Sequence, residues 1–142
     1  MSIAQNFNLN SNQYKTGDVY IPNPKIIFDF ARWTIKTESY PQLDSIARFL
    51  LKNDGLIIEV GTHTDSRGSD KYSTRLDTKR SESIAKFLIS KGINRVRLVA
   101  QGYGETQLII SDEEIDEMKT DFEREEAHAV NRRTEFKIIE IK

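Results

Sequence analysis

The sequence predicts an α+β domain, in which helices pack on one face of a mixed four-stranded sheet to give a two-layer α/β sandwich. The chain has 142 residues, 37% hydrophobic and 30% charged, which suits one domain with a real core. Short apolar runs typical of strands alternate with longer segments whose apolar residues recur at helical spacing. Because the joints between them are short, we predict the order βαβαββ, with an extra acidic helical segment before the last strand.

The first predicted strand and helix follow an N-terminal arm. Residues 1–24 are rich in Asn, Ser and Gln and are predicted to be an arm or linker, so the domain proper is placed at residues 25–142. The alternating run "KIIFDF", residues 25–30, predicts a strand. A helix is expected to start near Thr37 or Ser39 and to end before "NDG" at residues 53–55, with an apolar face made by Leu43, Ile46, Ala47 and Leu50.

The middle of the chain predicts two more strands with a helix between them. "LIIEVGT" at residues 56–62 and "RVRLVAQG" at residues 95–102 are short apolar runs. The segment between them, residues 69–92, has helical spacing, with Ser69 as the N-cap and Gly92 as the stop.

An acidic segment and a last strand complete the prediction. Ser111 and Glu114 match a capping box, and the apolar stripe after them is narrow: Ile115, Met118 and Phe122. The carboxylates of residues 111–127 invite a metal site, but their spacing matches no EF-hand loop, so we predict a solvated amphipathic helix. The last strand is expected within residues 131–142, with one face made by Thr134, Phe136 and Ile138.

Composition excludes several classes of function. A formal net charge of −1 argues against a protein that captures nucleic acid through a basic surface. The absence of cysteine excludes disulfides, thiolate nucleophiles and zinc-thiolate sites. No apolar run approaches the length of a membrane span, and the N-terminus has no signal-peptide pattern, so we expect a cytosolic protein or an excised or mature domain.

The charges between Thr62 and Ile84 are the main functional signal. On a helical wheel Arg80 falls within the apolar sector of the second helix, where a guanidinium needs an acceptor or a route to solvent. Asp65 follows the second strand in the turn that feeds this helix, so it is the expected anion of the same locality. Two interpretations stay open: an internal salt bridge between Asp65 and Arg80, or a clamp in which the two side chains hold the ammonium and carboxylate of one ligand. In the clamp, Ser66, Gly68 and Ser69 would add hydroxyl or backbone N–H donors.

Three motifs in order carry a family resemblance. "THTDSRGSDKYSTRLDTKRSESI" at residues 62–84, "GYGE" at 102–105 and "NRRTEF" at 131–136 resemble the C-terminal domain shared by outer membrane protein A, the peptidoglycan-associated lipoprotein and MotB. The opening segment "IIFDFARWTIKTESYPQLDSIARFL" is also similar, so the resemblance runs from about Lys25 to the end. The longer acidic segment is similar to that of Bacteroidetes-type relatives.

The resemblance implies non-covalent binding of peptidoglycan through the diaminopimelate residue of its stem peptide, with no cofactor and no metal. In the family the Asp of the "HTD" turn and an Arg of the following helix hold this amino acid, and here they match Asp65 and Arg80. Supporting contacts are expected from Asp29, Phe30, Ala31, Thr64, Ser66, Ser73, Leu76, Asn131, Arg132 and Arg133. Ser73 stands where relatives often have Asn, and Thr62 where many have Gly, so pocket shape there is expected to differ.

Other candidate residues have a structural and a functional interpretation. His63 is a ligand or base, or a turn histidine with local hydrogen bonds, and we favour the turn histidine; the same holds for His128. Trp33 lines the mouth of the pocket and packs on sugar or peptide, or it is a lid on the core. Arg132 and Arg133 alternate in direction on the last strand, so only one of them is expected to face the site.

The resulting functional hypothesis is a cell-wall anchoring module without chemistry of its own. Its expected location is the periplasm, in association with the outer membrane of a Gram-negative bacterium, and its expected partners are peptidoglycan and other envelope proteins. A protein-binding adaptor on the same fold is the alternative. A wall hydrolase is disfavoured, because the sequence has no Cys-His pair and no histidine cluster.

Overall fold

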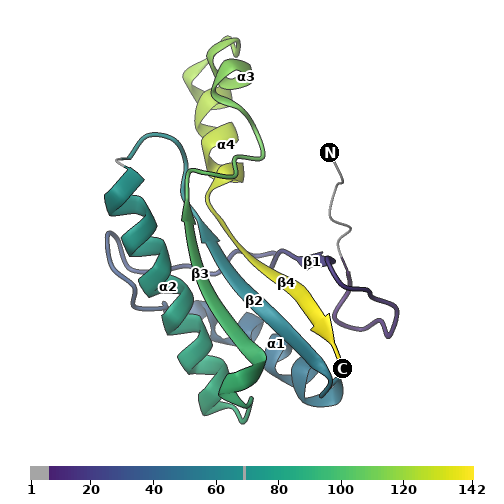
Figure 1. Ribbon diagram of the computed structural model, residues 1–142. Coiled ribbons are helices and arrows are strands. Elements are labelled where there is room, and N and C mark those ends of the chain that lie inside the picture. Colours follow the sequence, from purple (N-terminus) through teal and green to yellow (C-terminus); the bar gives the residue numbers. More distant parts are fainter. Residues whose placement is uncertain (1–6, 69) are drawn as a thin grey trace.

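The centre of the molecule is a four-stranded sheet with the strand order β1-β4-β2-β3. The computed structural model describes residues 7–68 and 70–142 (Figure 1). β2 runs parallel to β3 and antiparallel to β4, and β4 pairs with β1 in the antiparallel sense. The sheet is therefore mixed, which confirms the predicted fold class. The strands are β1 (Val19–Tyr20), β2 (Leu56–His63), β3 (Leu98–Gly104) and β4 (Arg133–Ile141).

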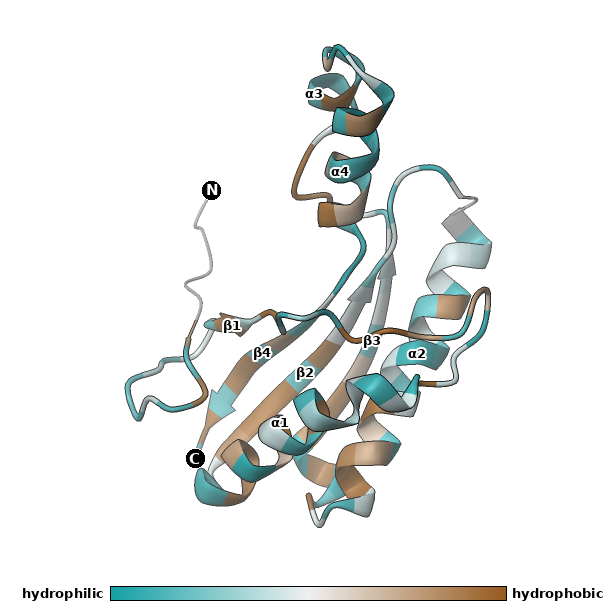
Figure 2. Cartoon of the chain, turned by 180° about the vertical axis from the view of Figure 1, so that it is seen from behind, coloured by the Kyte–Doolittle hydropathy of each residue, from teal (hydrophilic) through white to brown (hydrophobic). Residues whose placement is uncertain are grey.

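Two long helices, α1 (Tyr40–Lys52) and α2 (Asp70–Ser90), cover one face of this sheet. Alternate residues of β2 point toward them, and Leu56, Ile58 and Val60 are all at most 2% exposed. Figure 2 shows hydrophobic residues gathered along the strands and on the turns of the helices that lie against them. The core also contains Leu43, Ile46, Leu50, Ile84, Leu88, Phe136 and Ile138.

The close packing of α2 on β3 depends on the glycine that begins the "GYGE" motif. A Cβ atom on Gly102 would lie 2.3 Å from the backbone nitrogen of Thr78 and 2.6 Å from the carbonyl oxygen of Thr74. Both neighbours belong to α2 and cannot move aside. Gly102 is thus required for the approach of helix to strand, and this approach holds the site end of α2 in place.

The segment predicted as the first strand, residues 25–30, is not a strand. It forms one side of a hairpin-like loop with a single bridge between Phe28 and Ile35. The first strand of the sheet is instead β1, within the segment predicted as an arm. A short 3-10 helix, η1 (Thr37–Ser39), follows the loop and leads into α1.

Residues before the predicted boundary at Lys25 contribute to the core. Phe7 is buried and its ring lies 5.4 Å from that of Phe49 in α1. Tyr14 packs on the same ring and donates a hydrogen bond from its hydroxyl to Asn53 Oδ1 (2.6 Å). The division into an arm of residues 1–24 and a domain of residues 25–142 stays a prediction, since these contacts show packing and not independent folding.

The acidic segment contains two helices where one was predicted. α3 (Asp112–Asp116) and α4 (Asp121–Asn131) project beyond the end of the sheet (Figure 1). The predicted cap is confirmed, because Ser111 Oγ accepts a hydrogen bond from the Glu114 N–H (3.2 Å). Thr120 caps α4 in the same way. Of the predicted apolar stripe, Ile115 is buried whereas Phe122 is 73% exposed.

The remaining boundaries differ from the prediction by a few residues. Residues 95–97 form a 3-10 helix, η2 (Arg95–Arg97), before β3 begins. Asn131 belongs to α4, and β4 begins two residues later. The predicted N-cap at Ser69 lies outside the described residues. Among the helices that the structure describes, none is both long and apolar enough to span a membrane.

Candidate functional site

A cavity of about 470 Å³ opens where β2 ends and β4 begins. Arg80 reaches it from α2, and the loop after β1 closes another side. Four of its lining residues are basic, Lys25, Arg80, Arg132 and Arg133, and none is acidic. The other lining residues are Ile26, Ile27, Phe28, Thr62, His63, Ala129 and Thr134. We call this the main cavity.

Asp65 does not line the main cavity and is held by two arginines, of which Arg132 does line it. Its Oδ1 accepts from the N–H and Nε of Arg67 (2.9 and 3.2 Å), and its Oδ2 accepts from Arg67 Nη2 (2.9 Å) and Arg132 Nη1 (2.7 Å). Burial by itself raises the pKa of Asp65, but the hydrogen bonds from Arg67 and Arg132 outweigh it and hold the pKa well below the usual range. Asp65 is therefore an anion at any pH at which the protein works.

Glu125 of α4 completes this charge network. It accepts from Arg67 Nη1 (2.8 Å) and from Arg132 Nη2 (3.0 Å), so two acids and two arginines alternate. Glu125 is more than half exposed, whereas the Asp65 side chain is 10% exposed. The buried acid is the member of the network that most needs its partners.

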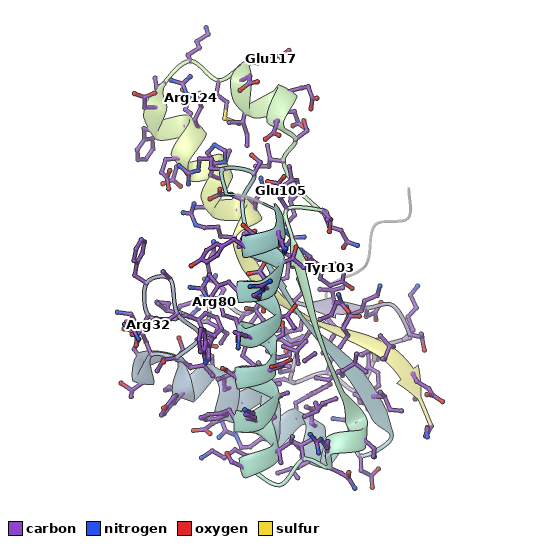
Figure 3. The ribbon with its side chains drawn as sticks, turned by 60° about the vertical axis from the view of Figure 1, so that its left-hand side comes forward. Arg32, Arg80, Tyr103, Glu105, Glu117 and Arg124 are labelled. Carbon is purple, nitrogen blue, oxygen red and sulfur yellow. The ribbon has the colours of Figure 1, made fainter. Side chains whose placement is uncertain are left out.

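Arg80 makes its contacts with the loop after β1. Its Nε donates to the carbonyl oxygen of Arg32 (2.8 Å), and its Nη2 approaches that of Asp29 (3.4 Å). Its guanidinium lies 4.9 Å from the centre of the Phe28 ring. Figure 3 shows Arg80 extending from α2 toward the loop that carries Arg32. Within the described chain, Nη1 of Arg80 makes no hydrogen bond and stays available to a ligand.

Of the two interpretations left open by the sequence, the internal salt bridge between Asp65 and Arg80 is not formed. Asp65 pairs with Arg67 and Arg132, and the acceptors of Arg80 are backbone carbonyls. The two residues are nevertheless brought to one end of the domain, because Arg132 both bonds to Asp65 and lines the main cavity with Arg80. Arg132 therefore lies between a buried anion, Asp65, and the free guanidinium edge of Arg80.

The anion expected beside Arg80 is Asp77, which sequence reasoning missed. Asp77 is fully buried one turn earlier on α2, and its Oδ2 accepts from the Gly104 N–H (3.0 Å) at the end of β3. Burial raises the pKa of Asp77 to about 6, although Arg80 and the Gly104 N–H act in the opposite direction. The nearby Thr64 hydroxyl also favours the ionised form of Asp77. However, Thr64 Oγ1 and Asp77 Oδ1 do not form a hydrogen bond with each other. The sequence did contain a signal for this contact: Asp77 and Arg80 are three residues apart on one helix, so their side chains are neighbours on its surface.

The predicted supporting residues of the "HTD" turn and of α2 have mainly structural contacts. The Thr64 N–H donates to the Gly104 carbonyl (3.0 Å), which ties the turn to β3. Ser66 Oγ donates to Asp112 Oδ1 of α3. Ser73 is buried, and a Cβ on Gly68 would come within 2.7 Å of its hydroxyl. Leu76 is half-buried. None of these four lines the main cavity.

The "NRR" motif divides into one structural residue and two at the cavity. Asn131 is fully buried, where its Oδ1 accepts from the N–H groups of Ile109 and Ile110 (2.8 and 2.9 Å). Arg133 is also buried and bonds to Glu135, to the Gln107 carbonyl and to the Asn131 carbonyl. Arg132 is the half-exposed member, with its ion pair to Asp65. Both arginines line the main cavity, so the expectation that only one faces it is wrong.

His63 ends β2 and is not a turn residue. Its ring stacks on Tyr103 with centroids 4.7 Å apart and planes within 4°. Burial, with a contribution from Arg133, lowers the pKa of His63 to about 3, so the ring is neutral. Thr62, the residue before His63, hydrogen bonds to Ser81 (2.7 Å), and this bond joins β2 to α2. His63 is therefore a neutral, stacked wall of the cavity, and the expected turn histidine with local hydrogen bonds is wrong.

Lys25 lines the main cavity, and the sequence analysis did not predict this. Its Nζ donates to the carbonyl oxygens of Ala129 and Arg132 (2.7 Å to the latter), which are acceptors at the C-terminal end of α4. Burial, with Arg132 and Arg133 nearby, lowers the pKa of Lys25. These partners are more than 100 residues away in the chain, so no local pattern signals the contact.

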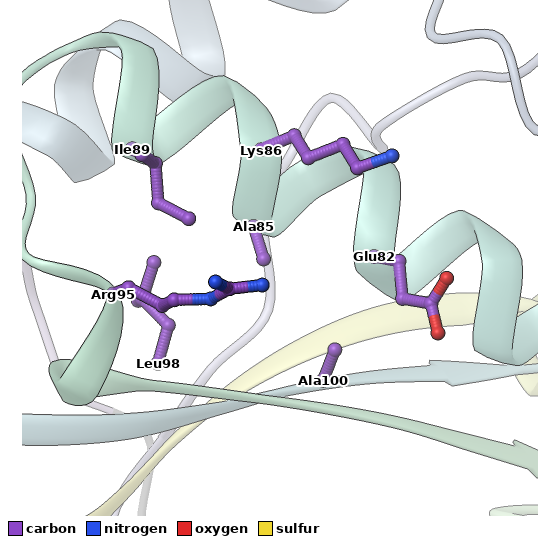
Figure 4. A pocket seen from close by; sticks show the side chains of 7 residues that line it. All are labelled: Glu82, Ala85, Lys86, Ile89, Arg95, Leu98 and Ala100. Atoms are coloured by element: carbon purple, nitrogen blue, oxygen red, sulfur yellow. The ribbon is translucent and has the colours of Figure 1, made fainter.

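Two of the cavities outside the main one bear on the predicted residues or on α2. Residues 30–34 line a cavity of about 420 Å³ that contains Phe30, Ala31 and Trp33. Trp33 is thus at the surface and not a lid on the core. A further cavity of about 380 Å³ lies between α2 and β3, with a floor of Ala85, Ile89, Leu98 and Ala100 (Figure 4). It contains no residue that the sequence analysis singled out. His128, in the last turn of α4, lines none of these three.

Known proteins share this fold and these motifs. Residues 27–121 match the model of the OmpA family. Outer membrane porin F of Pseudomonas fluorescens is 32% identical over 108 residues, which are 76% of this chain and 30% of the porin. The peptidoglycan-associated lipoprotein of Buchnera aphidicola is 32% identical over 82 residues, 58% of this chain and 47% of that protein. The chain thus spans less than half the length of either relative.

A solved structure confirms the architecture. The cell wall anchor of the T6SS from Pseudomonas aeruginosa superposes with a TM-score of 0.65 and 23% sequence identity. The superposition covers 87% of this chain and 80% of that one. At this identity the likeness concerns the fold, which is the two-layer arrangement described above.

Proposed function

Since this chain belongs to the OmpA family, we propose that it binds peptidoglycan non-covalently and anchors the outer membrane or an envelope complex to the cell wall. We take residues 25–142 as the binding unit, while the described residues 7–24 pack against it and supply β1. The place of action is the periplasm, on the inner side of the outer membrane. This is a binding function without catalysis.

The observation that carries the proposal is that Arg132, which lines the main cavity with Arg80, also bonds to Asp65, so a carboxylate and a guanidinium lie at one end of the domain. Asp65 is a buried carboxylate that stays ionised, and Arg80 presents an unused guanidinium edge at the main cavity. A ligand with an ammonium and a carboxylate on one carbon matches such a pair, because each charge gains a charge-assisted hydrogen bond. The free end of diaminopimelate in the stem peptide has this chemistry.

Arg132 determines how such a ligand would reach Asp65. In the free protein its Nη1 donates to Asp65 Oδ2, and its side chain is 41% exposed. An incoming ammonium would replace this contact, while Arg132 keeps its second bond to Glu125. The exchange replaces one charge-assisted hydrogen bond to the 10% exposed Asp65 side chain by another of the same kind. Asp65 is then never left unpaired during binding.

The relatives support the cell wall as the partner. One of them is named a peptidoglycan-associated lipoprotein, and others are outer membrane protein A from several bacteria, for example Shimwellia blattae with 37% identity over 84 residues. The segment that the family model matches, residues 27–121, includes Asp65 and Arg80. We therefore assign the wall-binding role of the matched region to this chain.

Co-sedimentation with purified sacculi tests the proposal. The protein should sediment with diaminopimelate-type sacculi and much less with lysine-type wall, whose side chain lacks the carboxylate that Arg80 would bind. Arg80→Ala should lose about 2 to 5 kcal/mol of binding, as expected when one member of a desolvated charge pair is removed. Arg75→Ala is the matched control, because Arg75 is an exposed arginine of the same helix.

The outcome also distinguishes a wall-binding domain from a protein-binding adaptor with the same fold. Circular dichroism must show that Arg80→Ala is folded, since Arg80 also holds the loop after β1. A folded Arg80→Ala protein that sediments like the wild type would overturn the clamp. The fold would then serve as an adaptor for other envelope proteins.

A further inference from the structure

The loop after β1 exposes two large aromatic side chains beside the main cavity. Phe30 is 96% exposed and Trp33 is 47% exposed. A phenyl ring so fully in water gains nothing for folding, because burial is the source of its stabilising free energy. Contiguous exposed apolar groups of this kind mark a binding surface.

These rings stand on a turn that is already fixed. The Asp29 N–H donates to the Thr34 carbonyl (2.9 Å), and the Arg32 N–H donates to the Asp29 carbonyl (3.0 Å). Ala31 adopts a left-handed backbone conformation with φ of 57°, which is unfavourable for a residue with a Cβ. A strained turn that is held by hydrogen bonds presents its side chains with little further loss of entropy on binding.

Arg80 joins this turn to the main cavity. It donates to the Arg32 carbonyl at the tip of the loop and lines the main cavity at the same time (Figure 3). Residues 30–34 line the adjoining cavity of about 420 Å³. A polymer held at Arg80 that continues outward would therefore meet Phe30 and Trp33 next.

We propose that Phe30 and Trp33 form a stacking platform for a sugar ring of the polymer whose stem peptide occupies the main cavity. The inference rests on the proposed function and extends it from the peptide to the glycan. A pyranose ring has a flat face of C–H groups and a rim of oxygens. The two rings match the apolar face. Lys79 Nζ lies over one face of the Trp33 ring, 4.6 Å from its centre, so the sugar would take the opposite face, and Lys79 and the exposed Arg32 would serve as donors for the rim.

Two soluble fragments separate the sugar contribution from that of the peptide. One is a diaminopimelate-containing tetrapeptide, and the other is the same tetrapeptide carrying its disaccharide. Isothermal titration calorimetry should show that the wild type binds the disaccharide fragment more tightly, by about tenfold if roughly half of the Phe30 side chain is covered. Phe30→Ala should remove this difference and leave binding of the bare tetrapeptide unchanged.

Phe122→Ala is the matched control, because Phe122 is 73% exposed on α4, away from the main cavity, and the chemical change is the same. It should keep the preference for the disaccharide fragment. Phe30→Ala is expected to fold normally, since the ring packs on almost nothing.

Each other outcome has a definite meaning. If wild type and Phe30→Ala show the same preference for the disaccharide fragment, the platform is wrong while the proposed function stands. If the wild type binds neither fragment, the proposed function fails and this inference with it. If Phe30→Ala instead loses binding to phosphatidylglycerol vesicles and keeps the fragment preference, the rings serve a membrane surface and the sugar assignment is overturned.

Discussion

Two buried aspartates beside the main cavity have pKa values shifted in opposite directions. Asp65 accepts four hydrogen bonds from two arginines, and these favour its ionised form more than burial disfavours it. Asp77 accepts one backbone N–H, and burial prevails. The number of charged donors therefore decides the sign of each shift. Asp65 is suited to attract a cation, and Asp77 adds a destabilising charge to the core.

We expect Asp77→Asn to stabilise the protein at neutral pH. The pKa of Asp77 rises from 3.8 to about 6 on folding, so the native state holds a proton that the unfolded state releases. The cost is absent below about pH 3.8, grows as the pH rises to 6 and stays constant above it, where it reaches about 3 kcal/mol at most. Urea unfolding at pH 7.5 should show a gain of about 1 to 3 kcal/mol, which disappears near pH 3.5.

The comparison at two pH values makes this prediction specific. Asn keeps an acceptor for the Gly104 N–H and offers a donor toward Thr64, so shape and hydrogen bonds are preserved. A loss of stability at pH 7.5 that is absent near pH 3.5 would mean that the Asp77 carboxylate stabilises the fold as an anion, and an equal loss at both pH values would mean that the changed shape or hydrogen bonding outweighs the charge.

At the residue scale, sequence reasoning placed Arg80 on the correct face of its helix and misassigned its partner. Helical spacing alone put Arg80 on the packed face of α2, and a guanidinium there needs acceptors. The acceptors are the Arg32 and Asp29 carbonyls, with the Phe28 ring below. Backbone carbonyls exist at every position, so residue identity cannot reveal which of them a side chain will reach.

At the scale of elements, the error at residues 25–30 has a physical cause. Ile26, Phe28 and Phe30 alternate as they would in a half-buried strand. Only Ile26 is buried, and the edge of β4 that such a strand would need is occupied by β1. The backbone of the segment is satisfied elsewhere, because the Ile27 N–H donates to Ser39 Oγ (2.8 Å). Competition for a sheet edge is a tertiary property that periodicity does not contain.

The junction of α4 and β4 depends on one buried amide. Asn131 accepts from the Ile109 and Ile110 N–H groups and donates to the Ile110 carbonyl (3.0 Å). Asn131→Ala should destabilise the protein by about 3 kcal/mol, because two backbone donors would lose their partner in a buried place. Denaturant unfolding measures this loss.

Asn94→Ala is the control for this substitution. Asn94 is exposed and accepts a single bond from the Val96 N–H (3.1 Å), so its removal should cost about 0.5 to 1 kcal/mol. Similar losses for the two variants would show that water replaces Asn131 at the junction and that the amide is not required.

At the scale of the whole molecule, a chain of formal net charge −1 separates its charges in space. Four basic residues line the main cavity without an acidic one. The acidic residues of α3 and α4 lie on the two helices that project beyond the sheet. Of these acids, only Glu125 contacts Arg132 and Arg67. The cavity therefore has a positive field although the protein does not. Fold stability rests on an apolar core that salt hardly affects, whereas the ligand recognition proposed above rests on charges.

This separation predicts different responses of binding and folding to salt. Raising NaCl from about 50 mM to about 500 mM shortens the Debye length from roughly 14 to 4 Å and should weaken sedimentation with diaminopimelate-type sacculi by about tenfold. The melting temperature in the same buffers should change by no more than about 2 °C, since the exposed pairs of Arg67, Arg132 and Glu125 contribute little to folding.

Sedimentation that is independent of salt at constant melting temperature would mean that apolar contacts, such as those of Phe30 and Trp33, supply the affinity. In that case Arg80→Ala should also bind like the wild type, which makes the two experiments a joint test of the charge clamp.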